Sequence, residues 1–325
     1  MEVSIIINTF NNESTIKRCL KSVVGQSLTD FECIVIDDCS FDQTRAICDG
    51  FIVIDKRIRV VHNQTNMGCS LTRKIGLEHS RGKYVVFIDG DDWMEFDYLE
   101  KMLEKAKKED ADLVYCDYYE EDGKTERYMP QNIDKKTKTQ IIAAMASYDP
   151  FLISSLWNKL IRRDLVLKVV FPEERYGEDM YISLQLAYYS TKSSCLSDPL
   201  YHYWVNNSNS ICNNKAKEAE RRLAMYDICK KILVFLDIHY TDNTVFEPFL
   251  SIRMNKTSLR IFSDPVLRKK RDAFVLYPPA IKYLFRKEVQ CDFVTKIKYY
   301  LCSIEHKVFR FIKCNNDSKS VRLNQ

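Results

Sequence analysis

Short, largely apolar runs alternate with helical patterns along the first half of the chain. The runs occupy residues 3–7, 32–36, 59–61, 84–88 and 112–115, and each is typical of a strand. Between them, apolar residues recur every three or four positions, as at Ile16, Leu20 and Val23, and such spacing is typical of helices. Strands that alternate with helices predict an α/β fold, with a mixed, mainly parallel sheet flanked by helices.

Local signals predict where the helices begin and end. The first helix is expected from about Asn12, and another around residues 99–106. Ser40-x-x-Gln43 has the pattern of a capping box and predicts the start of the helix after the second strand. Asn66-Met67-Gly68 predicts a turn into a helix over residues 70–79, which Gly82 is expected to end.

Short stretches that contain polar residues follow three of the predicted strands. They are Asn8-Thr9-Phe10, Asp37-Asp38 and Asp89-Gly90-Asp91-Asp92. In open α/β sheets, ligands bind in the crevice at the carboxyl ends of the strands, so we expect these residues to line one cleft. Each group alone is typical of a turn, but the set of three favours a ligand site.

The densest group of carboxylates is the one at residues 89–92. It follows the apolar run 84–88, which predicts a strand buried on both faces. In an extended chain Asp89 and Asp91 would point the same way and Asp92 the opposite way, while Gly90 would let a ligand approach the backbone. Two convergent carboxylates suit a hard divalent cation shared with a diphosphate. The alternative is a solvated acidic turn.

The charge of the chain is unevenly distributed. The 325 residues carry a net charge of +4, but residues 1–212 contribute −7 and residues 213–325 contribute +11. The length suits one large domain with a smaller appendage, so we predict a division at this point. The two parts are expected to meet different partners.

Several classes of site and location are disfavoured by the sequence. The 12 cysteines show no paired spacing and the 5 histidines are dispersed, so neither a disulfide framework, a zinc site nor a histidine-based active site is expected. The chain starts without a signal-peptide pattern and contains no apolar run of membrane-spanning length. We therefore expect a cytoplasmic protein.

Short stretches of the chain match a known family in order and approximate spacing. The chain resembles the inverting family 2 glycosyltransferases, which have the nucleotide-diphospho-sugar transferase (GT-A) fold. Within residues 3–118 the matching stretches are SIIINTFN (4–11), SVVGQS (22–27), DFE (30–32), DDCSFD (37–42), NMG (66–68) and GKYVVFIDGDD (82–92). A looser block extends to about residue 212 and comprises WNKL (157–160), Phe171, GED (177–179), YHY (201–203) and SI (210–211).

Five positions depart from the usual pattern of this family. Asn8 and Phe96 stand where proline is usual, Phe10 where tyrosine is usual, Lys74 where asparagine is usual and Trp204 where arginine is usual. Phe10 keeps a ring for stacking on a base but lacks the hydroxyl. These departures concern the details of donor binding rather than the reaction class.

The resemblance implies a set of donor-binding residues. Thr9 and Phe10 would lie against the nucleobase, Asp38 would accept a hydrogen bond from it, and Arg73 would reach the nucleotide or its phosphates. Trp157 and Lys159 would position the sugar or a phosphate. The alternatives are a core aromatic for Phe10 and Trp157, a solvated helix residue for Arg73 and a surface residue for Lys159.

The resemblance also assigns the metal ligands and the general base. Asp91, then Asp89, would hold Mg²⁺ or Mn²⁺ against the leaving diphosphate, with Asp92 a third choice that would serve the sugar or cap the next segment. Asp179 would deprotonate the acceptor hydroxyl as it attacks the anomeric carbon, which inverts the configuration. The alternative for Asp179, which is compatible with that role, is a carboxylate at a helix N-terminus.

Residues 1–212 are thus predicted to form a nucleotide-sugar-binding catalytic domain. We expect a metal-dependent inverting glycosyltransferase that moves a sugar from a nucleoside-diphosphate donor, preferably a UDP-sugar, to a growing cell-surface polysaccharide or a lipid-linked oligosaccharide. One alternative is a sugar-nucleotide nucleotidyltransferase, but residues 10–14 are not the glycine-rich basic loop it would need. The other is a non-catalytic nucleotide-binding module of the same fold.

Residues 213–325 are predicted to be basic and mostly helical, with breaks at prolines 248, 265 and 278–279. Apolar residues recur at helical spacing from Phe293 to Phe311 and are flanked by lysine and arginine. Such a helix can bind an anionic membrane peripherally, where it would meet a lipid-linked acceptor. The alternative is packing on the catalytic domain or on a second subunit in a homo-oligomer. No nucleic-acid-binding motif accompanies the basic charge.

Overall fold

A computed structural model describes residues 1–131, 133, 136–146, 154–206, 217–240, 246 and 254 of the chain. The chain divides into two compact units, Met1–Glu218 and Ala219–Gln325. In the second unit the described part is essentially one helix, α8 (Glu218–His239). The predicted proline breaks and the amphipathic pattern from Phe293 to Phe311 lie outside the described residues.

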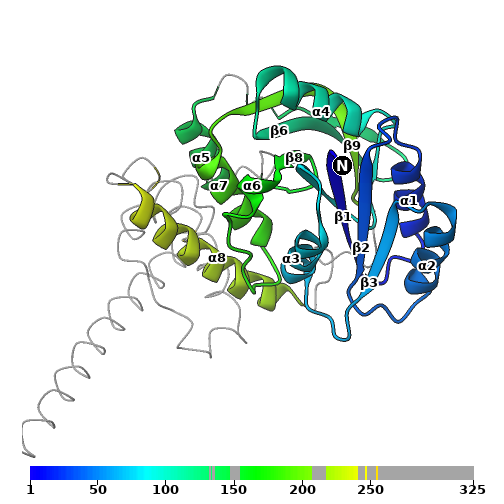
Figure 1. The fold of residues 1–325 in the computed structure, drawn as a ribbon. Coiled ribbons are helices and arrows are strands. Elements are labelled where there is room, and N and C mark those ends of the chain that lie inside the picture. The colour runs from blue at the N-terminus through cyan, green and yellow to red at the C-terminus, as the bar shows by residue number, and fades with distance from the viewer. Residues whose placement is uncertain are drawn as a thin grey trace, which may run out of the picture. The chain divides into compact units, whose positions relative to one another are not determined.

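The described part of the first unit contains a nine-stranded sheet with the order β3-β2-β1-β4-β8-β6-β9-β5, and β7 pairs with β6 (Figure 1). Strands β1 to β4 are mutually parallel, β8 is antiparallel to both β4 and β6, and β6 and β9 are parallel. The predicted mixed, mainly parallel sheet is therefore confirmed. The strands are β1 (Val3–Thr9), β2 (Phe31–Asp37), β3 (Ile58–His62), β4 (Tyr84–Asp89), β5 (Trp93–Met94), β6 (Leu113–Glu121), β7 (Glu126–Met129), β8 (Lys159–Arg162) and β9 (Ser193–Trp204).

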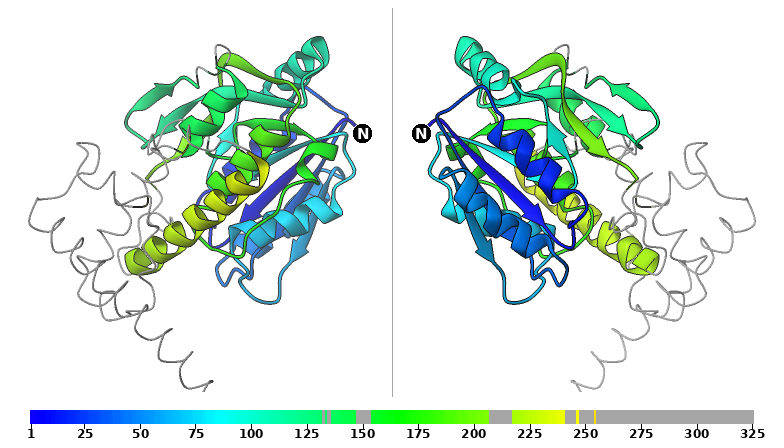
Figure 2. Two further views of the ribbon diagram at one scale, coloured as in Figure 1. Left: turned by 90° about the vertical axis from the view of Figure 1, so that its left-hand side faces the viewer. Right: turned by 90° about the vertical axis from the view of Figure 1, so that its right-hand side faces the viewer.

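Helices cover both faces of the parallel part of the sheet. Helices α1 and α2 lie on one face and α3 on the other (Figures 1 and 2). Alternating residues of β1 serve the two faces: Ile5 and Ile7 join the core cluster with α1, whereas Ile6 lies under Gly76 of α3. The helices of this unit are α1 (Ile16–Val24), α2 (Thr44–Ile54), α3 (Cys69–His79), α4 (Tyr98–Glu109), α5 (Lys138–Ala146), α6 (Arg163–Val166) and α7 (Glu178–Tyr189).

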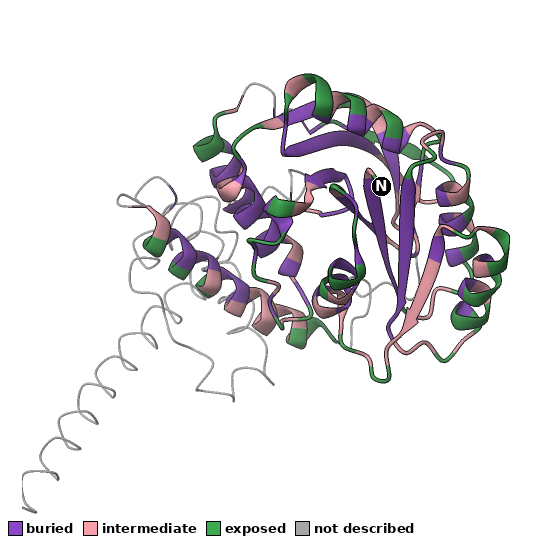
Figure 3. Ribbon diagram, viewed as in Figure 1, coloured by how far each residue is buried: buried purple, intermediate pink, exposed green. Residues whose placement is uncertain are grey.

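The continuous apolar runs are buried on both faces, as predicted. All residues of β1 and β2 are buried, and so are residues 85–88 of β4 (Figure 3). Alternation along a strand places neighbouring side chains on opposite faces, so a strand covered by helices on both sides needs apolar residues at every position. Strand β1 lies between β2 and β4 in this buried part of the sheet, so the ends of the three strands are adjacent.

Two of the predicted helix signals act differently in the structure. Helix α2 begins at Thr44, whose backbone N–H donates to Asp42 Oδ1 (2.9 Å), while Ser40 Oγ accepts from the backbone N–H of Asn11 (2.9 Å). The capping-box prediction was therefore wrong, because the Ser40 hydroxyl joins two loops instead of capping a helix. Gly82 does not end α3 either, since Ser80 follows the helix directly. A side chain on Gly82 would meet the Ser4 backbone nitrogen at 2.5 Å, so close contact with β1 requires the glycine.

Candidate active site

The three polar groups predicted at strand ends lie at neighbouring positions. Strand β1 lies between β2 and β4, with Asn8 paired to Asp89 and Thr9 paired to Asp37. This register brings the three groups to one edge of the sheet. The edge is the carboxyl end of the parallel strands, where α/β proteins bind ligands.

Residues 89–92 form a turn and do not continue the strand. The Asp92 N–H donates to the Asp89 carbonyl oxygen (3.0 Å), which closes the turn. The prediction that the side chains of Asp89 and Asp91 point the same way assumed an extended chain. That assumption was wrong, because the chain turns here. The role expected of Gly90 also changes, because a Cβ at this position would lie 2.6 Å from Thr9 Oγ1 and 2.8 Å from Thr9 Cβ. The close contact that requires glycine here is with Thr9.

The turn is attached to the protein on both sides. Asp92 is completely buried, and its carboxylate accepts hydrogen bonds from the Tyr201 hydroxyl and the backbone N–H of Trp204, both at 2.8 Å. Burial raises the pKa of Asp92 well above its usual range, and the charges of Asp91 and Asp89 add to that rise. Asp91 is half-buried, and its carbonyl oxygen accepts a hydrogen bond from Arg18 (3.0 Å). Asp92 thus anchors the turn to β9, while the Asp91 side chain lies closer to solvent.

This arrangement suits a magnesium or manganese ion. Mg²⁺ is usually held by one or two carboxylates together with substrate phosphates and water, rather than by a complete set of protein ligands. A half-buried aspartate on an anchored turn, with Asp89 beside it, offers such a partial set. The residues present therefore fit the predicted cation.

Arg73 of α3 lies at the centre of the edge and is only 2% exposed. Its Nη2 donates to Asp89 Oδ1 (2.7 Å) and its Nη1 to Asp179 Oδ1 (2.6 Å). Further bonds run from Nη1 to Glu178 Oε1 and from Nε to Asn8 Oδ1, both at 3.2 Å. The alternative of a solvated helix residue is wrong for Arg73. The predicted metal-binding turn and the predicted base are joined by one guanidinium.

Glu178 and Asp179 are the first residues of α7, after Gly177 in a left-handed conformation (φ 78°). Their position at the helix N-terminus matches the alternative considered for Asp179 and does not conflict with a role as base. Burial raises the pKa of Asp179, and the charge of Arg73 opposes that rise. Burial and the charge of Asp179 raise the pKa of Glu178 to about 8.

Asp38 organises the loop that precedes α3. Its carboxylate accepts hydrogen bonds from the Asn63 side chain (2.8 Å) and from the backbone N–H groups of Met67 (2.9 Å) and Gly68 (2.8 Å). A carboxylate has about four acceptor positions, so these three bonds use most of its capacity. The predicted contact with a nucleobase would draw on the remainder.

Phe10 follows the buried Thr9 and is 36% exposed, so the alternative of a core aromatic is wrong. Its ring meets that of Phe41 edge to face, with centroids 5.8 Å apart, and Phe41 is itself 85% exposed. The Thr9 hydroxyl points to Asn12 Oδ1 (3.3 Å). An exposed aromatic pair thus stands beside the strand ends, where a base could stack.

Trp157 and Lys159 are both buried. The Trp157 ring stacks on Tyr201 with centroids 4.6 Å apart and an interplanar angle of 10°, which supports the core alternative for this residue. Lys159 is fully buried, so the surface alternative is wrong. Its Nζ donates to the Ser155 carbonyl and to Asn158 Oδ1, and burial lowers its pKa to about 7.

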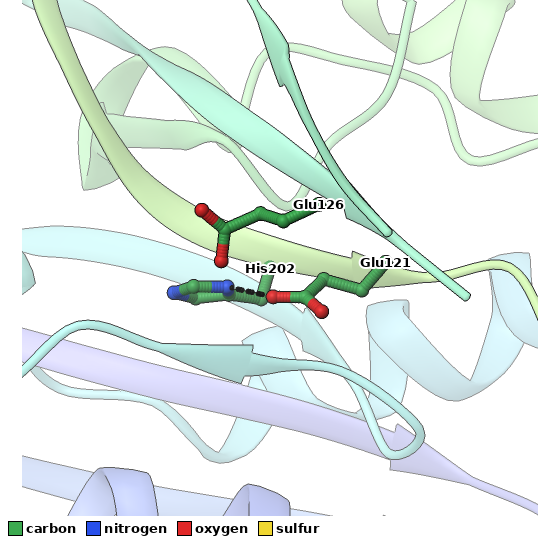
Figure 4. Close-up of side chains that lie close together, drawn as sticks. All are labelled: Glu121, Glu126 and His202. Atoms are coloured by element: carbon green, nitrogen blue, oxygen red, sulfur yellow. Dashed lines mark hydrogen bonds and ion pairs between the residues drawn. The ribbon is translucent and has the colours of Figure 1, made fainter. Parts of the chain in front are cut away.

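A second group with metal-binding chemistry lies on the flank of the turn. In the described part of the chain, Glu121, Glu126 and His202 form a group whose ligand atoms lie within 4.8 Å of one another (Figure 4). Both His202 nitrogens already face carboxylates, with Nδ1 2.9 Å from Glu121 and Nε2 2.8 Å from Glu95. His202 therefore connects β9 to two neighbouring segments and is poorly placed to bind a metal.

A pocket of about 500 Å³ lies away from the carboxyl edge. Residues from α4, α5, the end of α7 and the start of β9 line it, and none of the predicted site residues is among them. Lysines of this pocket already have partners, such as Glu109 for Lys105 and the Tyr188 carbonyl for Lys138.

The model of Glycosyl transferase family 2 matches residues 4–169. The chain belongs to this family. The matched region contains the turn, Arg73 and the ends of β1, β2 and β4, and the predicted family is thereby confirmed. The predicted class of enzyme, a glycosyltransferase, is supported by the named relatives as well.

The chain is similar to several curated proteins over about two thirds of its length. EpsH of Bacillus subtilis (strain 168) is 33% identical over 234 residues, which cover 69% of this chain and 67% of EpsH. The cholesterol galactosyltransferase of Borreliella burgdorferi is 30% identical, with 62% of this chain and 59% of that protein covered. The poly(ribitol-phosphate) β-N-acetylglucosaminyltransferase TarS of Staphylococcus aureus is 29% identical, with 62% and 35% covered.

Solved structures share the fold. TarS 1–349 from S. aureus has a TM-score of 0.66 at 21% identity, covering 89% of this chain and 82% of that one. Its complex with UDP-GlcNAc has a TM-score of 0.63 at 21% identity, with 87% and 78% covered. A mannosyltransferase from Pyrobaculum calidifontis, in complex with GDP-Man and Mn²⁺, has a TM-score of 0.54 at 14% identity, with 92% and 87% covered. These similarities confirm the predicted GT-A-like fold.

Among the helices that the structure describes, none has both the length and the apolar character needed to cross a membrane.

Two residues of the site were not assigned a role from the sequence. The sequence places Asn8 among the residues at the strand ends and as a departure from the usual proline, and it places Glu178 only in the Gly-Glu-Asp stretch. Both contact Arg73. The only sequence signal for these contacts is the amide side chain of Asn8, a polar group near the end of a strand that is largely apolar.

Proposed function

We propose that this family 2 chain is a metal-dependent, inverting glycosyltransferase that uses a UDP-sugar. The observation that carries the proposal is the grouping, at one sheet edge, of the anchored turn with Asp91, the exposed Phe10 and the carboxylate of Asp179. A neighbour of the same fold was crystallised with UDP-GlcNAc and with UDP, which supports UDP as the nucleotide. Another is in complex with GDP-Man and Mn²⁺, which supports a divalent cation.

In this proposal the donor lies along the carboxyl edge. Phe10 stacks on the base, Thr9 and Asp38 border it, and Asp91 with Asp89 holds Mg²⁺ or Mn²⁺ against the diphosphate. The cation, when bound, neutralises the charge that develops on the leaving diphosphate. Lys159 and Trp157 support the sugar-binding part of the site from within the core, because both side chains are buried and do not face a ligand directly.

Asp179 removes the proton from the acceptor hydroxyl. The acceptor oxygen then forms a bond to the anomeric carbon, while the bond from that carbon to the diphosphate oxygen breaks and its electron pair leaves with the diphosphate. Attack from the face opposite the leaving group inverts the configuration. The raised pKa of Asp179 makes its carboxylate a stronger base, and such bases contribute about 10²- to 10⁴-fold in rate.

The acceptor is proposed to be a growing cell-surface polysaccharide or a lipid-linked oligosaccharide. TarS, one of the relatives, is named for transfer to poly(ribitol-phosphate), which supports this class of acceptor. The +11 charge of residues 213–325 is the basis for proposing peripheral contact with an anionic membrane surface, where a lipid-linked acceptor would lie.

Calorimetric titration of UDP in the presence and absence of Mn²⁺, together with donor turnover, tests the proposal. Asp91→Ala is expected to lose both Mn²⁺-dependent binding and turnover, whereas Asp179→Ala keeps binding and loses turnover. Asp30→Ala, which removes an exposed carboxylate beside the start of β2, is the matched control and should change neither. Failure of the unmodified protein to bind any nucleoside diphosphate with Mn²⁺ would overturn the proposal.

A further inference from the structure

Arg73 holds together groups that are far apart in the sequence. It belongs to α3, and its partners are Asn8 at the end of β1, Asp89 at the end of β4, and Glu178 and Asp179 at the start of α7. A guanidinium has five N–H groups in a fixed plane, and four hydrogen bonds to these partners are present. The orientation of Arg73 is therefore fixed by bonds from several directions.

The position of Asp179 depends on this guanidinium. Its Oδ1 lies 2.6 Å from Arg73 Nη1, while the other end of the guanidinium lies 2.7 Å from Asp89. The planar group thus sets the separation between the predicted base and the predicted metal-binding turn. An error of about 1 Å in such a separation can cost about 10²-fold in rate.

The charges explain why α7 needs this contact. Three carboxylates, those of Asp89, Glu178 and Asp179, surround one guanidinium. Without it the charges of Asp89 and Asp179 would repel one another in a poorly hydrated site, where like charges interact strongly. The first turn of α7 would then be free to move away from β4.

Asn8 adds a fourth acceptor. Its Oδ1 accepts from Arg73 Nε at 3.2 Å, and its side chain is buried. Asn8 therefore adds to the bonds that orient Arg73.

We propose that Arg73, oriented by Asn8, is a positioning residue that holds Asp179 in register with the Asp89–Asp92 turn, and that it does not bind the nucleotide. This role rests on the proposed function of Asp179 as the base. It replaces the contact with the nucleotide implied by the family resemblance, because the guanidinium is 2% exposed and bonded to protein carboxylates.

The test uses the full chain and three variants. Asn8→Ala removes one acceptor of Arg73 and keeps all the charges. Arg73→Lys keeps the charge but cannot make the planar set of bonds. Arg57→Met is the matched control, since it breaks an arginine–carboxylate pair with Asp55 beside the start of β3. Thermal unfolding first verifies that each variant is folded.

Three quantities are measured: the Kd of UDP with Mn²⁺, donor turnover at saturating donor, and hydrogen exchange of peptides covering residues 172–182. We expect turnover to fall about 10²-fold in Arg73→Lys and less in Asn8→Ala, in line with a displaced base. The Kd should stay within about threefold of the unmodified protein, which corresponds to about 0.65 kcal/mol. Exchange at the start of α7 should rise in both variants and remain unchanged in Arg57→Met.

Two results would overturn the proposal. One is a Kd raised tenfold or more with turnover at saturation unchanged, because that pattern belongs to a nucleotide ligand. The other is unchanged exchange at the start of α7 in Arg73→Lys. If the unmodified protein neither binds UDP nor turns over any donor, the proposed function fails, and the exchange measurement still decides whether Arg73 holds α7.

Discussion

The two flanks of the turn at residues 89–92 are built from different interactions. On one side, the charged flank, Arg73 connects Asp89 to Glu178 and Asp179. On the other, the aromatic flank, the turn is followed by Trp93, whose ring stacks on His202 with centroids 4.8 Å apart. Arg18 covers the same ring at 3.6 Å and bonds the Asp91 carbonyl. Tyr201, Trp204 and the buried Asp92 complete the aromatic flank.

The aromatic flank supports the turn, whereas the charged flank contains the groups proposed to act in the reaction. Stacked rings and buried hydrogen bonds keep one geometry, because protein cores are closely packed and tolerate little displacement. The bonds of Arg73, by contrast, join groups of the proposed catalytic site. Substitutions on the aromatic flank should therefore change the free energy of unfolding, and substitutions on the charged flank should change turnover.

The largest effect is expected from Trp157→Ala. Trp157 stacks on Tyr201 and Tyr203 and meets Tyr118 edge to face, so its removal leaves a cavity behind the aromatic flank. The free energy of unfolding should fall by about 3–5 kcal/mol, measured by urea denaturation. Trp157→Phe should lose less. A loss below about 1 kcal/mol would show that the stack does not support the turn.

Asp92→Ala and Asp91→Ala test the comparison within one turn. Removing the Asp92 carboxylate leaves the Tyr201 hydroxyl and the backbone N–H of Trp204 without their acceptor, so unfolding should require about 2–4 kcal/mol less. Asp91→Ala should change the stability by no more than about 0.5 kcal/mol but abolish turnover. If urea titrations showed equal destabilisation by the two variants, Asp92 would not be the structural residue of the turn and Asp91 the functional one.

Phe10→Ala should weaken the binding of UDP without changing stability. Stacking of a base on an aromatic ring contributes about 1–3 kcal/mol, which corresponds to a rise in Kd of about 5- to 150-fold. Val53→Ala, at an exposed apolar residue of α2, is the control. Calorimetric titration measures both, and an unchanged Kd in Phe10→Ala would exclude stacking.

Glu178→Gln tests the charged flank through pH. The pKa of Glu178 is raised to about 8 in the folded protein, against 4.5 for its ordinary value, so the folded state binds the extra proton in this range. The stabilising contribution is present below about pH 4.5 and is lost as the pH rises toward 8. The slope of stability against pH should therefore be reduced in Glu178→Gln, by at most about 1.4 kcal/mol per pH unit. Identical slopes in urea titrations from pH 5 to 8 would contradict this.

Much of the fold could be predicted because its signals are local. The continuous apolar runs gave β1, β2 and β4 to within a residue or two, since strands covered on both faces have no polar positions. The antiparallel β8 between β4 and β6 could not be predicted, because its partners lie more than 40 residues away in the sequence. The order of strands depends on packing between elements rather than on any single stretch.

The sequence predicted which residues form the site better than it predicted how their side chains are arranged. Strand alternation suggested the directions of Asp89, Asp91 and Asp92, but the chain turns there, so the directions follow from the bonds of Asp92 instead. The meeting of Arg73 with Asp179 joins residues 106 positions apart. No local pattern encodes that contact, since it follows from the placement of α3 and α7 against the same strand ends.

The contact between Gly90 and Thr9 has a consequence for engineering the specificity of this protein. A Cβ at position 90 would lie 2.8 Å from the Thr9 Cβ, an atom that every residue except glycine possesses. Randomising position 90 alone would thus move the turn in every variant. Randomising position 9 alone leaves the turn in place only for side chains that fit beside Gly90. A library that seeks a new donor must vary these two positions as a pair, with glycine retained in at least one of them.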